Sequence, residues 1–406
     1  MQTRLLTALL STDAGREADA ILRQCVHCGF CNAVCPTYRL LGDELDGPRG
    51  RIYLIKQLLE GQRPTQRTQL HLDRCLTCLA CETTCPSGVR YRRLVDLGRR
   101  EVAQQVPRSS RGRLWRRLLL AVLPRRRLFA AVLAIGRGLR PILPAALRAQ
   151  VPALRGSEPV KVMVTPVGQR RVLLLRGCVQ PALEPHIDQA TSAVLRALGI
   201  EPIVAAEAGC CGAIELHLEA TAAALDRARR NIDAWWPLLE AGAEAIVVNA
   251  SGCGVMVKDY GELLRRDPRY AARAARVAAL ARDPIELLAN ENLDAFRLAA
   301  PRTIAFQSPC SLQHGQRLSG AVETLLRRLG YVLAPVADAG LCCGSAGTYS
   351  LLQTDIAHRL LRDKIASLEA GEPELIATAN IGCLLHLRGA TTRPVVHWLE
   401  LLRCEG

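Results

Sequence analysis

Two copies of one cysteine pattern constrain this chain more than any other feature. In each copy, three cysteines are separated by two residues, and a fourth cysteine follows after three more residues and directly precedes a proline. The copies consist of Cys25, Cys28, Cys31 and Cys35, and of Cys75, Cys78, Cys81 and Cys85. Two-cluster bacterial ferredoxins use this pattern, in which three cysteines hold one [4Fe-4S] cluster and the fourth holds the other. We therefore expect one cluster on Cys25, Cys28, Cys31 and Cys85, and a second on Cys75, Cys78, Cys81 and Cys35.

Zinc and disulfides are the alternatives for these eight cysteines. Four-cysteine zinc sites use two Cys-x2-Cys pairs, not triads that each have a distant fourth cysteine. Disulfides form in oxidising compartments, but residues 1–10 are followed by charged residues from Asp13 and lack the apolar run and cleavage site of a signal peptide. We expect a cytoplasmic protein whose cysteines hold metal.

Eight further cysteines form two matching groups in the second half of the chain. Each group contains an adjacent pair followed by glycine, with one cysteine upstream and one downstream. The groups are Cys178, Cys210, Cys211 and Cys253, and Cys310, Cys342, Cys343 and Cys383. Similarity also extends to residues 283–288 and 393–402, so this half is a duplication. Cys404 is left over, and the sequence predicts no role for it.

Strand-like and helix-like patterns alternate within each repeat. The β-rich runs include residues 171–175, 245–248, 303–306 and 375–377, and the longer helical patterns include 220–239 and 322–329. This alternation predicts parallel βαβ units. The cysteines follow the strand-like runs, at the strand ends where open α/β sheets place ligands.

The first cysteine motif lies between helical patterns at residues 18–24 and 50–59. The expected fold is therefore an α+β multidomain protein: an N-terminal α-helical ferredoxin domain followed by two duplicated α/β cysteine-rich lobes. We place the ferredoxin-type domain at residues 1–105, a basic connector at 106–168, and the repeats at 169–290 and 300–406.

The duplicated cysteines have two interpretations. Their soft thiolates favour an iron-sulfur cluster or another thiophilic metal, which would add one or two clusters to the two in the ferredoxin domain. The alternative is that they are buried cysteines that act as small apolar residues. His217, His314 and His386 lie near these cysteines and are candidates for tuning or ligation, although loop histidines are more often hydrogen-bonded structural residues.

Arginine dominates the connector. The formal charge of +15 is partly offset by clusters that each carry about −2, and much of the remainder lies in residues 108–148. Residues 111–140, which begin at Arg111 and end at Arg140, include an amphipathic helical pattern with Leu114, Leu118 and Val122 four residues apart.

This profile predicts either peripheral contact with the cytoplasmic face of the inner membrane, or packing against partner subunits or between the domains. No apolar run reaches the roughly 20 residues of a spanning helix. Trp115 and Phe129 are the segment's only aromatic residues, which argues against nucleic acid as a partner.

The Cys-Cys-Gly repeats resemble the cysteine-rich domain of heterodisulfide reductase and of several membrane-associated dehydrogenases. In the fullest form of that motif a Cys-x2-Cys pair closes each repeat, and the resemblance implies that five cysteines can hold a noncubane cluster. Here Ala250 and Asn380 occupy the position of the first cysteine of that pair. Four thiols per repeat could hold an ordinary cluster, but the noncubane disulfide chemistry is in doubt.

Essentially end to end, the chain resembles the iron-sulfur subunits of bacterial glycolate oxidase, a glycolate dehydrogenase. The resemblance is carried by residues 25–31, 41–53, 231–237 and 378–383. It implies that separate FAD-binding subunits oxidise glycolate to glyoxylate, and that this subunit has no catalytic residue for glycolate and passes electrons toward a quinone or another acceptor. Three alternatives remain: an equivalent subunit for lactate or glycerol 3-phosphate, a disulfide-reducing catalytic subunit, and lobes that bind no metal and serve as a scaffold.

Overall fold

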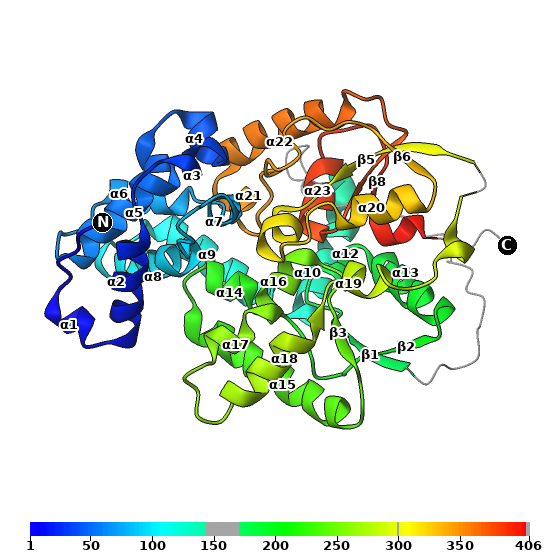
Figure 1. The fold of residues 1–406 in the computed structure, drawn as a ribbon, viewed down its shortest axis with the longest axis horizontal. Helices are drawn as coiled ribbons and strands as arrows, with labels where there is room; N and C mark the ends of the chain where they lie inside the picture. The colour runs from blue at the N-terminus through cyan, green and yellow to red at the C-terminus, as the bar shows by residue number, and fades with distance from the viewer. Residues whose placement is uncertain (143–169, 299, 403–406) are drawn as a thin grey trace.

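The computed structural model of the chain describes residues 1–142, 170–298 and 300–402, so Cys404 and the part of the expected connector from residue 143 onward lie outside the described residues. Residues 1–105 are all described and form a helical domain without a strand (Figure 1). Its elements are α1 (Thr7–Leu10), α2 (Asp13–Gln24), α3 (Phe30–Ala33), α4 (Pro36–Leu41), η1 (Glu44–Asp46), α5 (Pro48–Leu59), α6 (Gln66–Asp73), α7 (Ala80–Thr83) and α8 (Tyr91–Gln105).

Local sequence explains how the longer helices of this domain begin and pack. Thr12 caps α2 by accepting a hydrogen bond from Gly15 N, and Pro48 occupies the first turn of α5. Helices α2, α5 and α8 pack their apolar faces together, with Ile21, Ile55 and Leu94 almost fully buried. Cys25, Cys75 and Cys81 belong to the same core, so the core fixes the cysteine loops in place.

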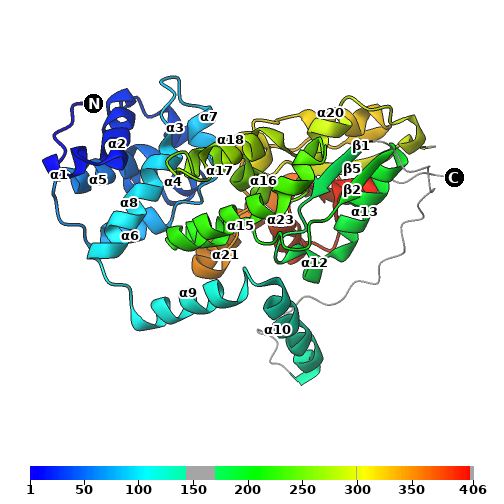
Figure 2. The same cartoon turned by 90° about the horizontal axis from the view of Figure 1, so that it is seen from below.

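Two helices lead from this domain to the lobes: α9 (Ser110–Val122) and α10 (Arg126–Leu139), followed by η2 (Arg140–Ile142). Figure 2 shows α9 along one side of the molecule and α10 projecting from it. Arg108, just before α9, and Arg116 within it both pair with Asp73 of the helical domain and Glu219 of the first lobe. Helix α9 therefore bridges the two parts of the chain, whereas α10 buries none of its residues. In the described part of the chain, no helix has the length and apolar character needed to cross a membrane.

Each lobe contains a four-stranded parallel sheet flanked by helices, so the predicted fold class is confirmed. The first lobe consists of β1 (Arg170–Leu174), α12 (Gln180–Leu183), α13 (Pro185–Ala197), β2 (Ile200–Ile203), α14 (Ala213–His217), α15 (Thr221–Glu240), β3 (Ala245–Val247), α16 (Ser251–Lys258), α17 (Tyr260–Leu263), α18 (Ala271–Leu280), β4 (Ala281–Arg282) and α19 (Pro284–Leu288). After η3 (Asp294–Phe296), the second consists of β5 (Arg302–Gln307), η4 (Ser311–Gly315), α20 (Ala321–Arg328), β6 (Tyr331–Leu333), α21 (Tyr349–Leu352), α22 (Thr354–Glu369), β7 (Leu375–Thr378), α23 (Ile381–Arg388), β8 (Val395–His397) and η5 (Trp398–Leu401).

The two sheets have the same topology, as a duplication requires. Their strand orders are β2-β1-β3-β4 and β6-β5-β7-β8. A capping box follows the last strand of each sheet, formed by Asp283 with Glu286 in one lobe and by His397 with Glu400 in the other. Asp283 therefore corresponds to His397, which accounts for the similar segments at the ends of the repeats.

Candidate iron-sulfur sites

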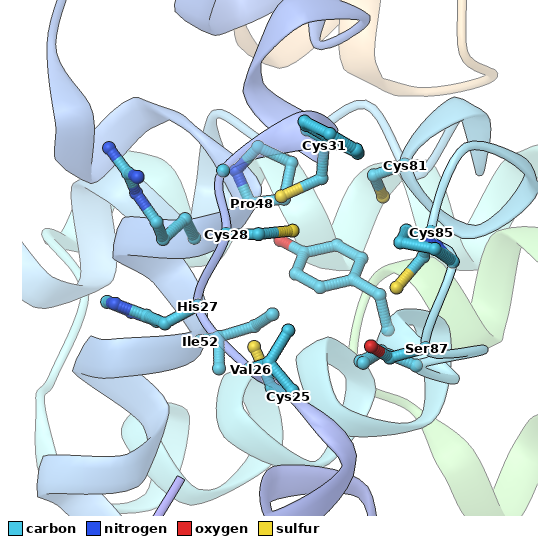
Figure 3. Close-up of a pocket in the computed structure, with 16 residues that line it drawn as sticks. Cys25, Val26, His27, Cys28, Cys31, Pro48, Ile52, Cys81, Cys85 and Ser87 are labelled. Atoms are coloured by element: carbon cyan, nitrogen blue, oxygen red, sulfur yellow. The ribbon is translucent and has the colours of Figure 1, made fainter.

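The first predicted group of four cysteines lines one cavity of the helical domain. Cys25, Cys28, Cys31 and Cys85 all face it (Figure 3). The loop that carries the first three turns tightly because His27 and Gly29 adopt left-handed conformations, with φ of 61° and 86°. A side chain at Gly29 would place a Cβ atom 2.5 Å from Arg49 Nη1. The left-handed backbone of this turn favours glycine at position 29, and the flexible Arg49 side chain would have to move aside for any other residue.

The second predicted group lines a neighbouring cavity. Cys35, Cys75, Cys78 and Cys81 all face it. Thr77 and Leu79 shape the loop here, with φ of 52° and 65°. Cys81, Pro48 and Tyr91 line both cavities, so the two groups of cysteines are separated by little more than these side chains.

A buried arginine faces the second cavity from α5. Arg51 is 1% exposed, and its guanidinium donates to His71 O at 2.7 Å and to Thr37 Oγ1 at 3.1 Å. Its Nη1 atom lies 3.9 Å from Cys35 Sγ. Asp46 is its buried counterion, but that carboxylate also pairs with Arg74 at 2.7 Å. The two positive charges of Arg51 and Arg74 therefore exceed the single negative charge of Asp46.

A second buried arginine approaches the same cysteines from α8. Arg99 donates to Leu72 O at 2.9 Å and to Cys75 O at 2.6 Å. Burial raises the pKa of the Cys75 thiol, but the charges of Arg51 and Arg99 outweigh burial and hold that pKa below its ordinary value. Thr77 N and Tyr91 Oη also donate to Cys75 Sγ, at 3.4 and 3.6 Å. The surroundings of this cavity thus favour a negatively charged sulfur-rich group.

The Cys-Cys-Gly pairs lie beyond β2 and β6, at the carboxyl ends of the sheets. Gly212 and Gly344 both have φ of 90°. A Cβ atom on Gly212 would lie 3.0 Å from Ala224 O of α15, and one on Gly344 would lie 2.5 Å from Ala357 O of α22. Glycine follows each cysteine pair because a helix of the same lobe passes directly against it.

Each lobe brings its own four cysteines together. In the first lobe the thiols of Cys178 and Cys211 donate to Cys210, which holds the pKa of Cys210 well below its ordinary value. In the second, Cys310 contacts Cys342, and Cys343 contacts Cys383. The expectation that the cysteine loops of each lobe converge matches this arrangement.

Charged neighbours distinguish the two lobes. In the first, Glu215 Oε2 lies 3.7 Å from Cys210 Sγ and pairs with Arg227. In the second, Lys364 is 1% exposed and donates to Asp338 O and Ala339 O. Burial lowers the pKa of Lys364, whereas the four nearby cysteines act in the opposite direction. A buried ammonium group beside four cysteines would stabilise negative charge on them.

The four cysteine groups adjoin one another in a row. Cys78 of the helical domain packs in one apolar cluster with Cys310 and Cys342 of the second lobe, together with Leu76 and Tyr349. Tyr349 also donates to Arg74 O at 3.0 Å, which fixes this contact. In turn, Cys253 of the first lobe packs against the cluster that contains Cys343 and Cys383. The order is therefore the Cys28 group, the Cys78 group, the second lobe and the first lobe.

Two of the three candidate histidines, His314 and His386, make structural contacts. His314 Nδ1 lies 2.9 Å from Thr83 Oγ1 and so joins the second lobe to α7. His386 Nε2 lies 3.4 Å from Ala357 O. Burial, followed by the charges of Arg92 and Arg99, lowers the pKa of His217 to about 3, so its imidazole stays neutral. The contacts of His314 and His386 agree with a structural interpretation of these two histidines.

One further cluster has the spacing of ligands to a single ion. Asp43, Asp46 and His71 place one ligand atom each within 4.8 Å of the others. Arg51 and Arg74 already pair with the Asp46 carboxylate, and His71 Nδ1 lies 3.0 Å from it. This cluster is an ion-pair network beside the second cavity.

Sequence patterns did not indicate the roles of Arg51, Arg99 or Lys364. Arg51 lies in the segment 41–53 that carries the family resemblance, but nothing in the pattern distinguishes it from the half-buried Arg49. Arg99 and Lys364 occur in ordinary helical patterns. Only tertiary packing identifies them as buried cations beside cysteines.

Comparison with known proteins agrees with this arrangement. A family model described as a 4Fe-4S dicluster domain matches residues 21–89, and one described as a cysteine-rich domain matches residues 172–258 and 304–388. The helical domain is thus a two-cluster iron-sulfur domain, and its paired cavities, eight cysteines and buried arginines fit that cofactor.

Three curated relatives cover much or all of the chain. It is 54% identical over 404 residues to the glycolate oxidase iron-sulfur subunit of Escherichia coli K12, covering 99% of this chain and 98% of that protein. It is 31% identical to the probable glycolate oxidase iron-sulfur subunit of Bacillus subtilis 168, covering 95% and 94%. Lactate utilization protein A of Bacillus pumilus is 26% identical and matches 57% of this chain and 98% of its own length.

Proposed function

Because this chain belongs to the family of glycolate oxidase iron-sulfur subunits, we propose that it is the electron-transfer subunit of a complex that oxidises glycolate to glyoxylate. FAD-binding partner subunits carry out the oxidation, and no residue of this chain acts on glycolate. A bound [4Fe-4S] cluster supplies one-electron transfer, which divides the two-electron oxidation at the flavin into single steps.

In this proposal each cluster of the helical domain takes a ligand from the other motif. Cys25, Cys28, Cys31 and Cys85 hold one cluster, and Cys75, Cys78, Cys81 and Cys35 hold the second. The support is that Cys85 lines the cavity of the first three cysteines and Cys35 lines the cavity of the second three, with Cys81 between the two cavities.

The continuous row of cysteine groups is the observation that carries the proposed function. Cys78 and Cys310 belong to one apolar cluster, so the Cys78 group of the helical domain leads directly into the second lobe. We propose that Cys310, Cys342, Cys343 and Cys383 hold a third cluster, and that Cys178, Cys210, Cys211 and Cys253 hold a fourth.

The far end of the row adjoins α10. This helix packs on α12, which begins two residues after Cys178, and Arg137 Nη1 donates to Ala182 O at 3.2 Å. Its exposed apolar residues, Leu128, Val132, Ile135 and Leu139, recur at intervals of three or four and so form one face of the helix.

We propose that α10 lies on an anionic membrane surface and brings the first lobe close to a quinone acceptor. Residues 108–142 contain ten arginines and no acidic residue. An apolar stripe flanked by arginines is typical of helices that lie in the membrane interface. The complex would then be cytoplasmic and peripheral on the inner membrane.

Anaerobic electron paramagnetic resonance (EPR) tests this proposal. The chain is purified with its flavin subunits, and spectra are recorded before and after addition of glycolate, with iron and sulfide counted on the same sample. Reduction of the clusters by glycolate is the expected result. Clusters that dithionite reduces but glycolate does not would contradict glycolate as the substrate, and an iron count near 8 per chain would contradict clusters in the lobes.

Lactate is the second candidate substrate, because lactate utilization protein A matches 57% of this chain. The same sample distinguishes the two candidates if L-lactate is added in place of glycolate. If lactate reduces the clusters and glycolate does not, the chain would be the electron-transfer subunit of a lactate-oxidising complex. The assignment of the cysteines would not change.

A further inference from the structure

Cys28 stands apart from the other cysteines because its side chain reaches the surface. Among the sixteen cysteines in the described part of the chain it alone is exposed, and the cysteines of both lobes are buried apart from the half-buried Cys253. The second cavity of the helical domain is covered by the second lobe. The Cys28 group is therefore the end of the row that another protein can approach most closely.

Large apolar side chains surround this exposed cysteine. Val26 is 68% exposed, Phe30 62% and Tyr53 45%. All four phenylalanines of the chain are described, and Phe30 is the only exposed one. Figure 3 shows that Val26 and Cys28 belong to the same loop around the first cavity, and the Tyr53 ring lies 6.3 Å from the His27 ring. We call Val26, Cys28, Phe30 and Tyr53 the Cys28 face.

The rim of the Cys28 face is charged but locally neutralised. Arg49, whose guanidinium lies beside Gly29, pairs with Glu44 at 2.6 Å. An aromatic and apolar centre with a polar rim is the usual anatomy of a specific protein interface. Exposed apolar groups of this size, gathered around a cofactor ligand, are costly to leave in water without a partner.

We infer that the Cys28 face is the docking site of the electron-donating flavin subunit. The inference deepens the proposed function and rests on it. Electron transfer becomes much slower as the distance between cofactors increases, so the donor flavin must approach an exposed end of the row. The other end adjoins α10, through the contact of that helix with α12, and α10 carries the proposed membrane surface. The Cys28 face is therefore the exposed end of the row that is left for the donor flavin.

Three substitutions test this inference on the full chain with its flavin subunits. Phe30→Asp and Tyr53→Asp place a charge at the centre of the Cys28 face, and Tyr53 lies outside both cysteine motifs. Phe30→Leu keeps the face apolar. Val332→Asp is the matched control, because Val332 is an apolar residue of intermediate exposure between Tyr53 and Phe30, 50% exposed, on β6 of the second lobe. The dithionite-reduced EPR spectrum and the iron content of each variant show whether the clusters are intact.

The two readouts are the dissociation constant for the flavin subunits, which tests the docking site, and reduction of the complex by glycolate, which tests the proposed substrate. We expect Phe30→Asp and Tyr53→Asp to raise the dissociation constant for the flavin subunits, measured by calorimetry, at least tenfold, with cluster spectra unchanged. Phe30→Leu and Val332→Asp should leave it within about twofold. Unchanged affinity in both Asp variants would overturn the docking site, as would a wild-type chain that does not bind the flavin subunits. If the wild-type complex forms but glycolate does not reduce it, the proposed substrate fails, while the affinities still decide the docking site.

Discussion

The side-chain amide of Asn380 donates a hydrogen bond to Cys383 Sγ at 3.6 Å, and its oxygen accepts one from Gly252 N at 3.3 Å. Asn380 occupies the position at which related cysteine-rich repeats carry another cysteine. It joins a cysteine of the second lobe to the first turn of α16 in the first lobe. In this chain the position therefore serves the contact between the lobes, and it offers no fifth thiol for disulfide chemistry.

Replacing Asn380 should weaken the contact between the lobes. Asn380→Ala leaves Gly252 N without its acceptor at a half-buried position, and an unsatisfied group of this kind costs about 1–3 kcal/mol. We expect a lower thermal unfolding midpoint with the iron of the helical domain retained. Asn292→Ala is the control, because Asn292 accepts a hydrogen bond in an exposed loop, and its midpoint should change little. Equal midpoints for the two variants would show that the contact contributes no stability.

Crossed ligation in the helical domain predicts paired mutant spectra. Cys85→Ser should damage the same cluster as Cys28→Ser, although the two cysteines belong to different motifs, because both line the first cavity. Cys35→Ser should instead reproduce the spectrum of Cys78→Ser. EPR spectra of the four dithionite-reduced variants make the comparison. If Cys85→Ser resembled Cys78→Ser, each motif would hold its own cluster.

Sequence reasoning predicted the local features of the sites and missed the contacts between them. The Cys-x2-Cys-x2-Cys-x3-Cys-Pro pattern sufficed to group Cys25 with Cys85, because that spacing is tied to one known geometry. Alternating patterns similarly predicted β1, β3, β5 and β7, which precede the single cysteines of the lobes, whereas the named runs did not include β2 and β6, which precede the Cys-Cys-Gly pairs. No pattern connects Cys78 with Cys310, which lie far apart in the chain and meet only through packing around Leu76 and Tyr349. Similarly, Arg99 becomes a cation beside Cys75 only after α8 packs on α6.

The buried arginines should set the reduction potential of one cluster. Reduction adds negative charge, which burial disfavours and the guanidinium of Arg99 stabilises. We expect Arg99→Gln to lower the equilibrium constant for reduction of the cluster at Cys75 about tenfold, a fall of roughly 59 mV for one electron, with the other cluster unaffected. Arg99→Lys keeps the positive charge, so the reduction potential of this cluster should stay close to that of the wild type. Redox titration followed by EPR measures both potentials, and equal shifts in the two clusters would contradict a local effect.

His186 should make the stability of the lobe interface depend on pH. Its Nε2 atom lies 3.0 Å from Glu184 and 3.2 Å from Glu400 of the second lobe, and these two carboxylates raise the pKa of His186 to about 9. Arg388 also pairs with Glu184. Burial lowers the pKa of the adjacent His397 to about 4, so that group stays neutral over the range concerned.

Because the folded pKa of His186 exceeds its ordinary value of 6.5, the stabilisation is complete below pH 6.5 and is lost as the pH rises through 9. We expect the free energy of unfolding to fall by about 1–2 kcal/mol, a figure reduced to allow for solvent screening of His186. The fall should appear as a lower thermal midpoint between pH 6.5 and 9.5. His186→Gln should remove this slope, whereas His358→Gln, at an exposed position of α22, should keep it. A slope that persists in His186→Gln would assign the effect to other groups.

Helix α10 provides the sharpest test of membrane contact, because four of its large apolar residues are exposed. Val132 and Ile135 are 46% and 64% exposed, and α10 buries none of its residues. Replacing both with serine should therefore leave the fold intact but remove much of the roughly 1.5–3 kcal/mol that each side chain contributes when buried in lipid. We expect binding to phosphatidylglycerol-containing vesicles to weaken at least tenfold in a sedimentation assay.

Binding of the wild-type chain should also weaken with added salt, since the arginines contribute through the surface potential. Val204→Ser, at an exposed apolar position of the first lobe, should bind as the wild type does. A wild-type chain that ignores anionic vesicles would instead assign the apolar face of α10 to a protein partner.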